Sequence, residues 1–307
     1  MAHLLYDPTI FGVKLNPIDI YQLTVGDEMF GSDYLSVRWA ISKGLVNQNI
    51  CDHAAQAGYL KCLQYLNKQG YRWNTRTCSI LSSYGHLDCL IYLHEQGCPW
   101  NKSTCNAAAE FGYLECLRYA HEQGCPWNSL TCSNAAMGGH LDCLIYAHEQ
   151  GCPWDVLTCT YAARYNHLNC LIYAHEEGCP WGVWTCSYAA INGHLSILQY
   201  AHEEGCPWNE WTCHYAAEYG HLDCLIYAHE NGCPWNRITC SSARLNGHLD
   251  CLHYAHENGC LQPKRYNYYW MNIICLISAV PIGVFLWQNV GFYLLNNVLV
   301  LCTAKSY

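Results

Sequence analysis

The sequence predicts an all-α solenoid built from about eight copies of one helix-turn-helix unit. A fixed period of about 20 to 50 residues is typical of solenoids, and here the period is 27 residues. Apolar residues recur within each unit at helical spacing, and no segment alternates with a period of two, so we expect no sheet. The period is seen most clearly in the tripeptide Cys-Pro-Trp, whose cysteine recurs at Cys98, Cys125, Cys152, Cys179, Cys206 and Cys233.

The first helix of a unit is illustrated by the copy from Asn101 to Trp127. We expect Thr104 to be its N-cap, because a hydroxyl there accepts a hydrogen bond from a free backbone N–H. Gly112 is expected to end it, as a glycine after a helix commonly does. The packing face consists of small residues that let another helix approach closely: Cys105, Ala108 and Ala109.

The second helix of the same unit is apolar over a wide arc, as expected for a helix that lies between neighbours. Gly124 is expected to end it, and Pro126 in the Cys-Pro-Trp turn prevents its continuation. Its apolar positions are Leu114, Cys116, Leu117, Tyr119 and Ala120, and its solvated positions are Glu115, Arg118 and Glu122.

Three regions are predicted: an N-terminal segment 1–48, a repeat solenoid 49–260 and a hydrophobic tail 261–307. Residues 34–44 resemble the second half of a degenerate unit, which would cap the solenoid. Residues 271–287 form an apolar run of 17 residues flanked by aromatic side chains, near the lower limit for spanning a membrane. Two interpretations stay open for this run, a membrane anchor with the repeats on the cytoplasmic side and a degenerate terminus.

Composition argues against several classes of function. A net charge of −9 with only 15 basic residues is unlike a nucleic-acid-binding surface. The 24 cysteines follow no signal peptide, which favours a reducing compartment such as the cytoplasm. Every candidate nucleophile and histidine recurs from copy to copy, whereas a catalytic group occurs once. We therefore expect a protein that is not an enzyme, has no cofactor and is a monomer.

The repeated motif also resembles a known family. The pattern T-C-x-x-A-A-x-x-G-H-L-D-C-L-x-Y-A-H-E-x-G-C, as at Thr131–Cys152, is similar to the ankyrin repeat, T-P-L-H-x-A-A-x-x-G-H-L-E-V-V-x-x-L-L-x-x-G-A. It looks most like the short cysteine- and tryptophan-rich ankyrin-type repeats of large DNA viruses of amoebae and of some protists. The resemblance implies stacked helix pairs that bind protein partners. The unit is shorter than the usual length of about 33 residues, and the missing part is the protruding β-hairpin.

Cysteine and histidine are abundant enough to raise a zinc-binding or redox-responsive alternative. Structural zinc sites use closely spaced pairs, whereas six residues separate Cys98 from Cys105 and no CxxC occurs. The cysteines stand where ankyrin units carry small apolar residues, so we expect them to pack as small hydrophobes, with no metal site. Disulfides between equivalent cysteines of successive units are excluded by the helix-to-helix distance of roughly 8 to 10 Å. Pairs within one unit stay open.

The histidines form two columns for which we also expect structural roles. His148 and its equivalents lie in the last turn of the second helix, near the carbonyl end of the helix dipole. His140 and its equivalents lie in the turn before that helix, where a ring nitrogen can bond neighbouring backbone.

The positions that vary between copies are the candidates for partner binding. Two precede each Gly-His pair, and two more precede each Thr-Cys pair; stacking would align each column along the solenoid. Neutral drift at exposed sites is the alternative, and a membrane-tethered adaptor is another function that the tail would permit. The expected partner is an unidentified protein, with contacts at Glu110, Phe111, Met137, Arg164, Tyr165, Trp184, Ile191, Trp211, Glu218 and Tyr219.

Overall fold

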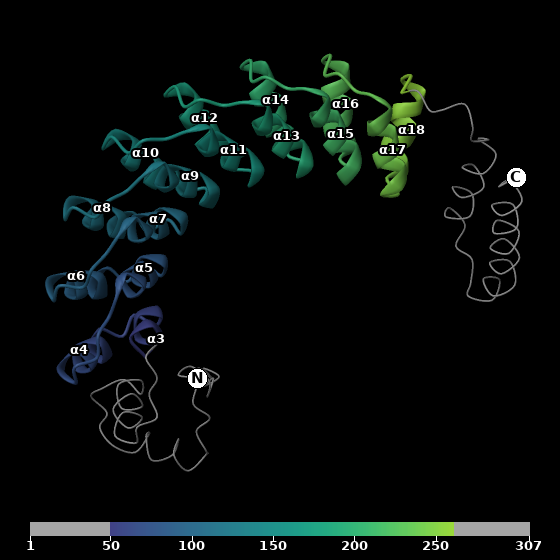
Figure 1. Cartoon of the computed structure of the whole chain (residues 1–307). Coiled ribbons are helices and arrows are strands. Elements are labelled where there is room, and N and C mark those ends of the chain that lie inside the picture. Colours follow the sequence, from purple (N-terminus) through teal and green to yellow (C-terminus); the bar gives the residue numbers. More distant parts are fainter. Residues whose placement is uncertain (1–49, 261–307) are drawn as a thin grey trace, which may run out of the picture. The chain divides into compact units, whose positions relative to one another are not determined.

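The computed structural model describes residues 50–260. The predicted cap at 34–44 and the candidate anchor at 271–287 lie outside this range. Between residues 50 and 260 there are sixteen helices and no strand, and the helices form eight successive pairs (Figure 1). This confirms an all-α solenoid of 27-residue helix-turn-helix units without a β-hairpin. None of the described helices is long and apolar enough to cross a bilayer.

The pairs follow one another in chain order, and the helix numbers are those of Figure 1. The first helices of the pairs are α3 (Ile50–Gln56), α5 (Thr75–Ser83), α7 (Lys102–Glu110), α9 (Ser129–Gly138), α11 (Val156–Arg164), α13 (Val183–Ile191), α15 (Glu210–Tyr219) and α17 (Arg237–Leu245). The second helices are α4 (Leu60–Lys68), α6 (Leu87–Glu95), α8 (Leu114–Glu122), α10 (Leu141–Glu149), α12 (Leu168–Glu176), α14 (Leu195–Glu203), α16 (Leu222–Glu230) and α18 (Leu249–Glu257).

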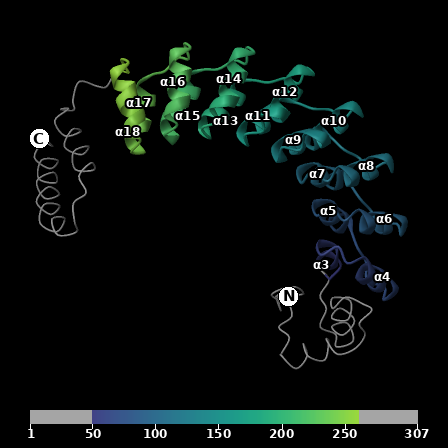
Figure 2. The same ribbon diagram turned by 180° about the vertical axis from the view of Figure 1, so that it is seen from behind.

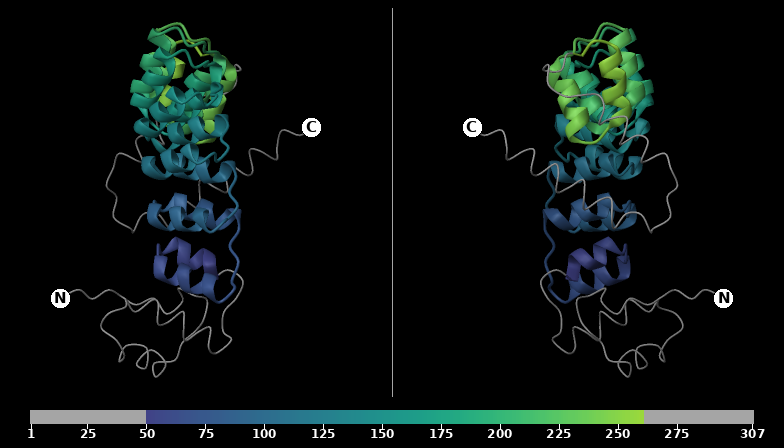
Figure 3. Two further views of the ribbon diagram at one scale, coloured as in Figure 1. Left: turned by 90° about the vertical axis from the view of Figure 1, so that its left-hand side faces the viewer. Right: turned by 90° about the vertical axis from the view of Figure 1, so that its right-hand side faces the viewer.

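The helices of residues 50–260 form two layers. The odd-numbered helices make an inner layer and the even-numbered helices an outer layer, as both faces of the molecule show (Figures 1 and 2). Figure 3 shows successive pairs stacked on one another. Neighbouring inner helices pack much more closely than neighbouring outer helices. The small residues predicted for this contact, such as Cys105, Ala108 and Ala109, are fully buried and allow that approach.

The observed start of α7 shows that the predicted N-cap was wrong. Thr104 is not the N-cap of α7; it lies buried in the first turn, and Asn101 is the N-cap, with Oδ1 accepting from the backbone N–H of Ser103 at 2.9 Å. Asp155 caps α11 in the same way, at 2.9 Å from the nitrogen of Leu157. A carboxamide or carboxylate at this position satisfies a free N–H, and in two units the threonine hydroxyl bonds the preceding unit instead.

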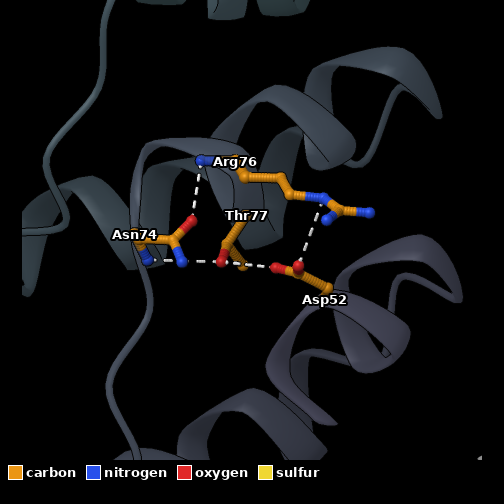
Figure 4. A network of polar contacts seen from close by, with 4 residues as sticks. All are labelled: Asp52, Asn74, Arg76 and Thr77. Carbon is orange, nitrogen blue, oxygen red and sulfur yellow. Dashed lines mark hydrogen bonds and ion pairs between the residues drawn. The ribbon is translucent and has the colours of Figure 1, made fainter. Parts of the chain in front are cut away.

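One such contact joins α3 to α5. The hydroxyl of Thr77 donates to Asp52 at 2.8 Å, and the side chain of Arg76 forms an ion pair with the same carboxylate at 3.4 Å (Figure 4). Asn74 caps α5 beside them by accepting from the backbone N–H of Arg76. The N-terminal end of one inner helix is thereby fastened to the preceding inner helix.

The turn between the two helices of a unit depends on glycine. Gly112 has a φ of 77°, in the left-handed region, and the ring of His140 from the next unit lies directly over it. A Cβ at Gly112 would overlap that ring. The sequence predicted that a ring nitrogen of this histidine column bonds neighbouring backbone. His221 confirms it, because its Nε2 lies 2.9 Å from the carbonyl oxygen of Ile191 in the preceding unit. Glycine and histidine together set the spacing between units.

The outer layer is held by a recurring contact of three rings. In six units the histidine in the last turn of the outer helix stacks on the tryptophan of the following Cys-Pro-Trp turn, with ring centroids 3.7 to 3.9 Å apart. Its Nδ1 atom lies 2.9 to 3.0 Å from a tyrosine hydroxyl of the next unit. The same tyrosine packs edge-on against the tryptophan, as in the pair Trp154 and Tyr173. The indole thus joins two units and does not only cover apolar surface.

Candidate protein-binding surface

The surface of the inner layer is formed by three positions of each odd-numbered helix. Counted from the N-cap, these are the second, sixth and tenth residues, which share one face because they are four residues apart. In α15 they are Trp211, Tyr215 and Tyr219. The neighbouring positions Cys213, Ala216 and Ala217 are buried between helices. Each inner helix therefore presents one column of variable side chains to solvent.

All ten residues predicted for partner binding lie on the inner helices or directly after them, and none is fully buried. The most exposed aromatic side chains are Trp184 and Tyr219, each 51% accessible. Glu110, Met137, Ile191 and Glu218 are half-buried beside the exposed column. The other exposed members of the set are Phe111, Arg164, Tyr165 and Trp211.

The aromatic members gather on three consecutive inner helices. We call the following set the aromatic surface: Tyr161 and Tyr165 of α11 and its C-cap, Trp184 and Tyr188 of α13, and Trp211, Tyr215 and Tyr219 of α15. Within a helix the rings contact each other, with centroids 6.4 Å apart for Tyr161 and Tyr165, 5.8 Å for Trp184 and Tyr188, and 5.7 Å for Trp211 and Tyr215.

Arg164 links the first two helices of the aromatic surface. Its guanidinium carbon lies 5.4 Å from the ring centroid of Tyr165 and 5.1 Å from that of Tyr188 on the next inner helix. These distances are within the range for attraction between a cation and an aromatic ring. The rings of this surface therefore present faces that accept a guanidinium group.

The third helix continues the surface and adds an acidic group. Burial raises the pKa of Tyr215, and so do the nearby Glu218, Tyr219 and Tyr188. The carboxylate of Glu218 lies 3.1 Å from Nε2 of His214. Tyr215 therefore stays a neutral phenol at physiological pH, next to a carboxylate.

The part of the chain that carries the aromatic surface is predominantly acidic. Between Arg118 and Arg237 the sequence contains a single lysine or arginine, which is Arg164. The same stretch contains twelve acidic residues: Glu122, Asp142, Glu149, Asp155, Glu176, Glu177, Glu203, Glu204, Glu210, Glu218, Asp223 and Glu230. Three of them, Asp155, Glu210 and Glu218, belong to inner helices or their N-caps, and the other nine lie on the outer helices or directly after them. A net negative charge in this part of the chain favours cationic partners over anionic ones.

The sixth-position column was not predicted from the sequence, although a signal for it was present. Tyr161, Tyr188 and Tyr215 each precede Ala-Ala in three successive copies, where the other copies carry His53, Ile80, Ala107, Asn134 and Ser242. This column matters because it lies on the same helix face as the second and tenth positions. That alignment can be recognised only when the first residue of the helix is known. With Thr104 taken as N-cap the three columns could not be placed on one face.

Within the described residues, the cysteine and histidine side chains considered as zinc ligands do not come together as a metal site. Between residues 50 and 260, no three side chains of histidine, cysteine, aspartate or glutamate gather in an arrangement that could hold a metal ion. Histidines of the two recurring columns contact rings or backbone instead, as His148 does with Trp154 and His221 with the carbonyl oxygen of Ile191.

Comparison with solved structures gives a likeness of fold alone. No protein-family model and no curated protein matches the sequence. Among solved structures, the chain is similar to the human ASB11 ankyrin repeat domain, with 18% sequence identity and a TM-score of 0.44 over 52% of this chain and 84% of that one. The assignment of the fold as an ankyrin-like solenoid of helix pairs rests on the repeat geometry described above.

Proposed function

We propose that the chain is a non-catalytic scaffold that binds a protein partner through the aromatic surface of α11, α13 and α15. The partner segment is basic and carries arginine. Tyrosine and tryptophan dominate the energetics of many protein interfaces, because they bury a large area with few rotatable bonds. Here several of them lie exposed side by side on a rigid stack, which supports binding without a conformational change.

The observation that carries this proposal is the position of Arg164 over the rings of Tyr165 and Tyr188. It is an internal example of the contact that a partner's arginine would make with Trp184, Trp211 and Tyr219. The net negative charge of this part of the chain, with Glu210 and Glu218 on α15 itself, would favour such a segment and would disfavour nucleic acid.

The ten residues predicted from the sequence take different parts in this proposal. Arg164, Tyr165, Trp184, Trp211, Glu218 and Tyr219 form or border the proposed contact, with Ile191 beside them. Glu110, Phe111 and Met137 lie on or after α7 and α9, closer to the N-terminus, where Glu110 accepts from Asn134 at 3.3 Å. They would extend the contact for a longer partner segment.

A selection experiment tests the proposal while the partner is unidentified. The full chain is used to select peptides from a random display library, with Trp211→Ala as a counter-selection and Glu176→Gln as a matched change on the outer layer. We expect peptides enriched in arginine that are retained by the wild type and by Glu176→Gln but lost on Trp211→Ala. Enrichment of acidic peptides, or equal retention by Trp211→Ala, would refute it.

A further inference from the structure

Seven units contain two buried cysteines, twenty residues apart in the sequence, that lie close together inside the unit. In the unit of α5 and α6, Sγ of Cys78 lies 3.0 Å from Sγ of Cys98. In the last described unit, Cys240 and Cys260 are joined as a disulfide, with Cα atoms 6.4 Å apart. In four other pairs Sγ of the first cysteine lies 3.8 to 4.0 Å from the backbone carbonyl oxygen of the second: Cys105–Cys125, Cys132–Cys152, Cys159–Cys179 and Cys213–Cys233. The seventh pair is Cys186 and Cys206, in which the neighbouring Cys206 raises the pKa of Cys186.

The two members of a pair differ in their surroundings. Cys125 accepts a hydrogen bond from Cys105, and this lowers the pKa of Cys125 against the opposing effect of burial. The same bond, with burial, raises the pKa of Cys105. Cys125, whose Sγ also donates to the backbone carbonyl oxygen of Asn101 at 3.2 Å, is thus the more acidic thiol of its pair. A low-pKa thiolate beside a second cysteine is the usual arrangement of a redox-active pair.

A third cysteine column behaves differently and provides an internal control. It lies in the outer helices, where burial raises the pKa of Cys116 and Cys170 to about 11. In α14 the same position is taken by Ile197. These cysteines behave as small apolar residues, as expected from the sequence. The first described unit provides a second control, because the residue twenty positions after Cys51 is Tyr71.

We propose that the seven cysteine pairs are sites of reversible disulfide formation, with hydrogen peroxide or another small peroxide as the oxidant. A small oxidant is required because the sulfur atoms are buried. The second cysteine of a pair loses its thiol proton and its sulfur attacks a peroxide oxygen; the O–O bond breaks, the departing oxygen takes up that proton, and sulfenic acid and water result. The partner thiol then attacks the sulfenic sulfur and expels a second water. Overall, two thiols and one hydrogen peroxide give one disulfide and two waters.

The geometry restricts the products to pairs within a unit. The Cα separation of Cys240 and Cys260 lies within the range that a disulfide can span. Each bond would connect an inner helix to the turn that leads into the next unit, as for Cys186 of α13 and Cys206. The oxidised chain is therefore expected to resist unfolding more strongly than the reduced chain.

Peptide mapping of the full chain tests this proposal. Reduced protein is treated with excess hydrogen peroxide, alkylated with iodoacetamide under denaturing conditions, and digested without reduction for mass spectrometry. We expect cross-linked peptides that join cysteines twenty residues apart, alkylated cysteines in the outer helices, and complete reversal by dithiothreitol. Links between different units or chains, oxidation of the outer-helix cysteines to the same extent, or no links in folded protein would overturn it.

Two matched variants distinguish the paired cysteines from the outer-helix cysteines that only pack. Cys116→Ile copies the residue found at Ile197 and should leave every cross-link in place, with the same peroxide-induced rise in the urea midpoint as wild type. Cys125→Ser should abolish one cross-link and leave Cys105 free for alkylation. Protection of Cys105 in Cys125→Ser would contradict the proposed pairing. If Cys125→Ser fails to fold, the maps of wild type and Cys116→Ile still decide the question.

Discussion

The Nδ1 atom of His148 lies 2.9 Å from the hydroxyl oxygen of Tyr173, which belongs to the next unit. The same imidazole stacks on Trp154 with ring centroids 3.8 Å apart. One histidine therefore connects the end of its own helix, the turn that follows and the next outer helix. Because this arrangement recurs along the chain, the tryptophan column belongs to the scaffold, and the exposed aromatic residues of the inner layer are free for binding.

Two tryptophans should respond differently to truncation. Trp154 is half-buried between His148 and Tyr173, so Trp154→Ala should lower the free energy of unfolding by about 2 to 3 kcal/mol, less than for a fully buried indole. Trp184 is 51% exposed, and Trp184→Ala should change the free energy of unfolding by less than about 0.5 kcal/mol. Urea denaturation measures both. Equal losses would contradict the assignment of one indole to the scaffold and the other to the binding surface.

Two glycines with the same backbone conformation should differ in their tolerance of alanine. Gly124 has a φ of 81° and open space around it, so Gly124→Ala should cost about 1 kcal/mol, from the left-handed conformation alone. Gly112 has a φ of 77° and lies under the ring of His140, so Gly112→Ala should cost about 1 to 3 kcal/mol more. Thermal or urea unfolding of the two variants checks the difference. Similar costs would show that the ring can move aside.

Acid should destabilise the solenoid through the histidines in the turns. Burial lowers the pKa of His194, only partly offset by its hydrogen bond to the backbone of Arg164, and the same holds for His167 with Met137. Below the unfolded-state pKa of about 6.5, the unfolded chain binds more protons than the folded one. The stabilisation that these neutral histidines contribute is thus complete above the unfolded-state pKa. It is lost as the pH falls through their folded-state pKa.

Urea unfolding between about pH 7.5 and pH 5.5 measures this effect. The free energy of unfolding should fall as the pH falls, and His194→Asn should make the slope shallower, because one depressed histidine is removed. A stability that is constant or rises over this interval would contradict the role assigned to the ring at the turn.

The sequence alone predicted the units well, because their boundaries depend on local chemistry. Asn101, taken as the start of a unit, is the N-cap of α7, and Gly112 and Gly124 lie just beyond the helices they were expected to end. The N-cap itself was assigned wrongly to Thr104. Asparagine and threonine are both good N-caps, three residues apart here, and local propensity alone did not decide between them.

Contacts between units were harder to predict. The bond from His148 to Tyr173 and the pairing of Cys78 with Cys98 join residues 25 and 20 positions apart, and their side-chain distances depend on the angle between successive pairs. Periodicity shows that such columns exist but not which columns meet. The tyrosines at 161, 188 and 215 could be assigned to the aromatic surface only once the helix register was known.

The most direct test of the proposed function is isothermal titration calorimetry of the full chain with two synthetic peptides, one of alternating arginine and glycine and one with citrulline in place of arginine. The account predicts that the arginine peptide binds and the citrulline peptide does not, because only the guanidinium cation is attracted to the rings. Trp184→Ala and Trp211→Ala should each weaken binding by about tenfold or more, with unchanged unfolding midpoints, while Glu176→Gln should have a smaller effect. Equal binding of both peptides, or wild-type affinity in both tryptophan variants, would contradict the claim that this surface binds a basic partner.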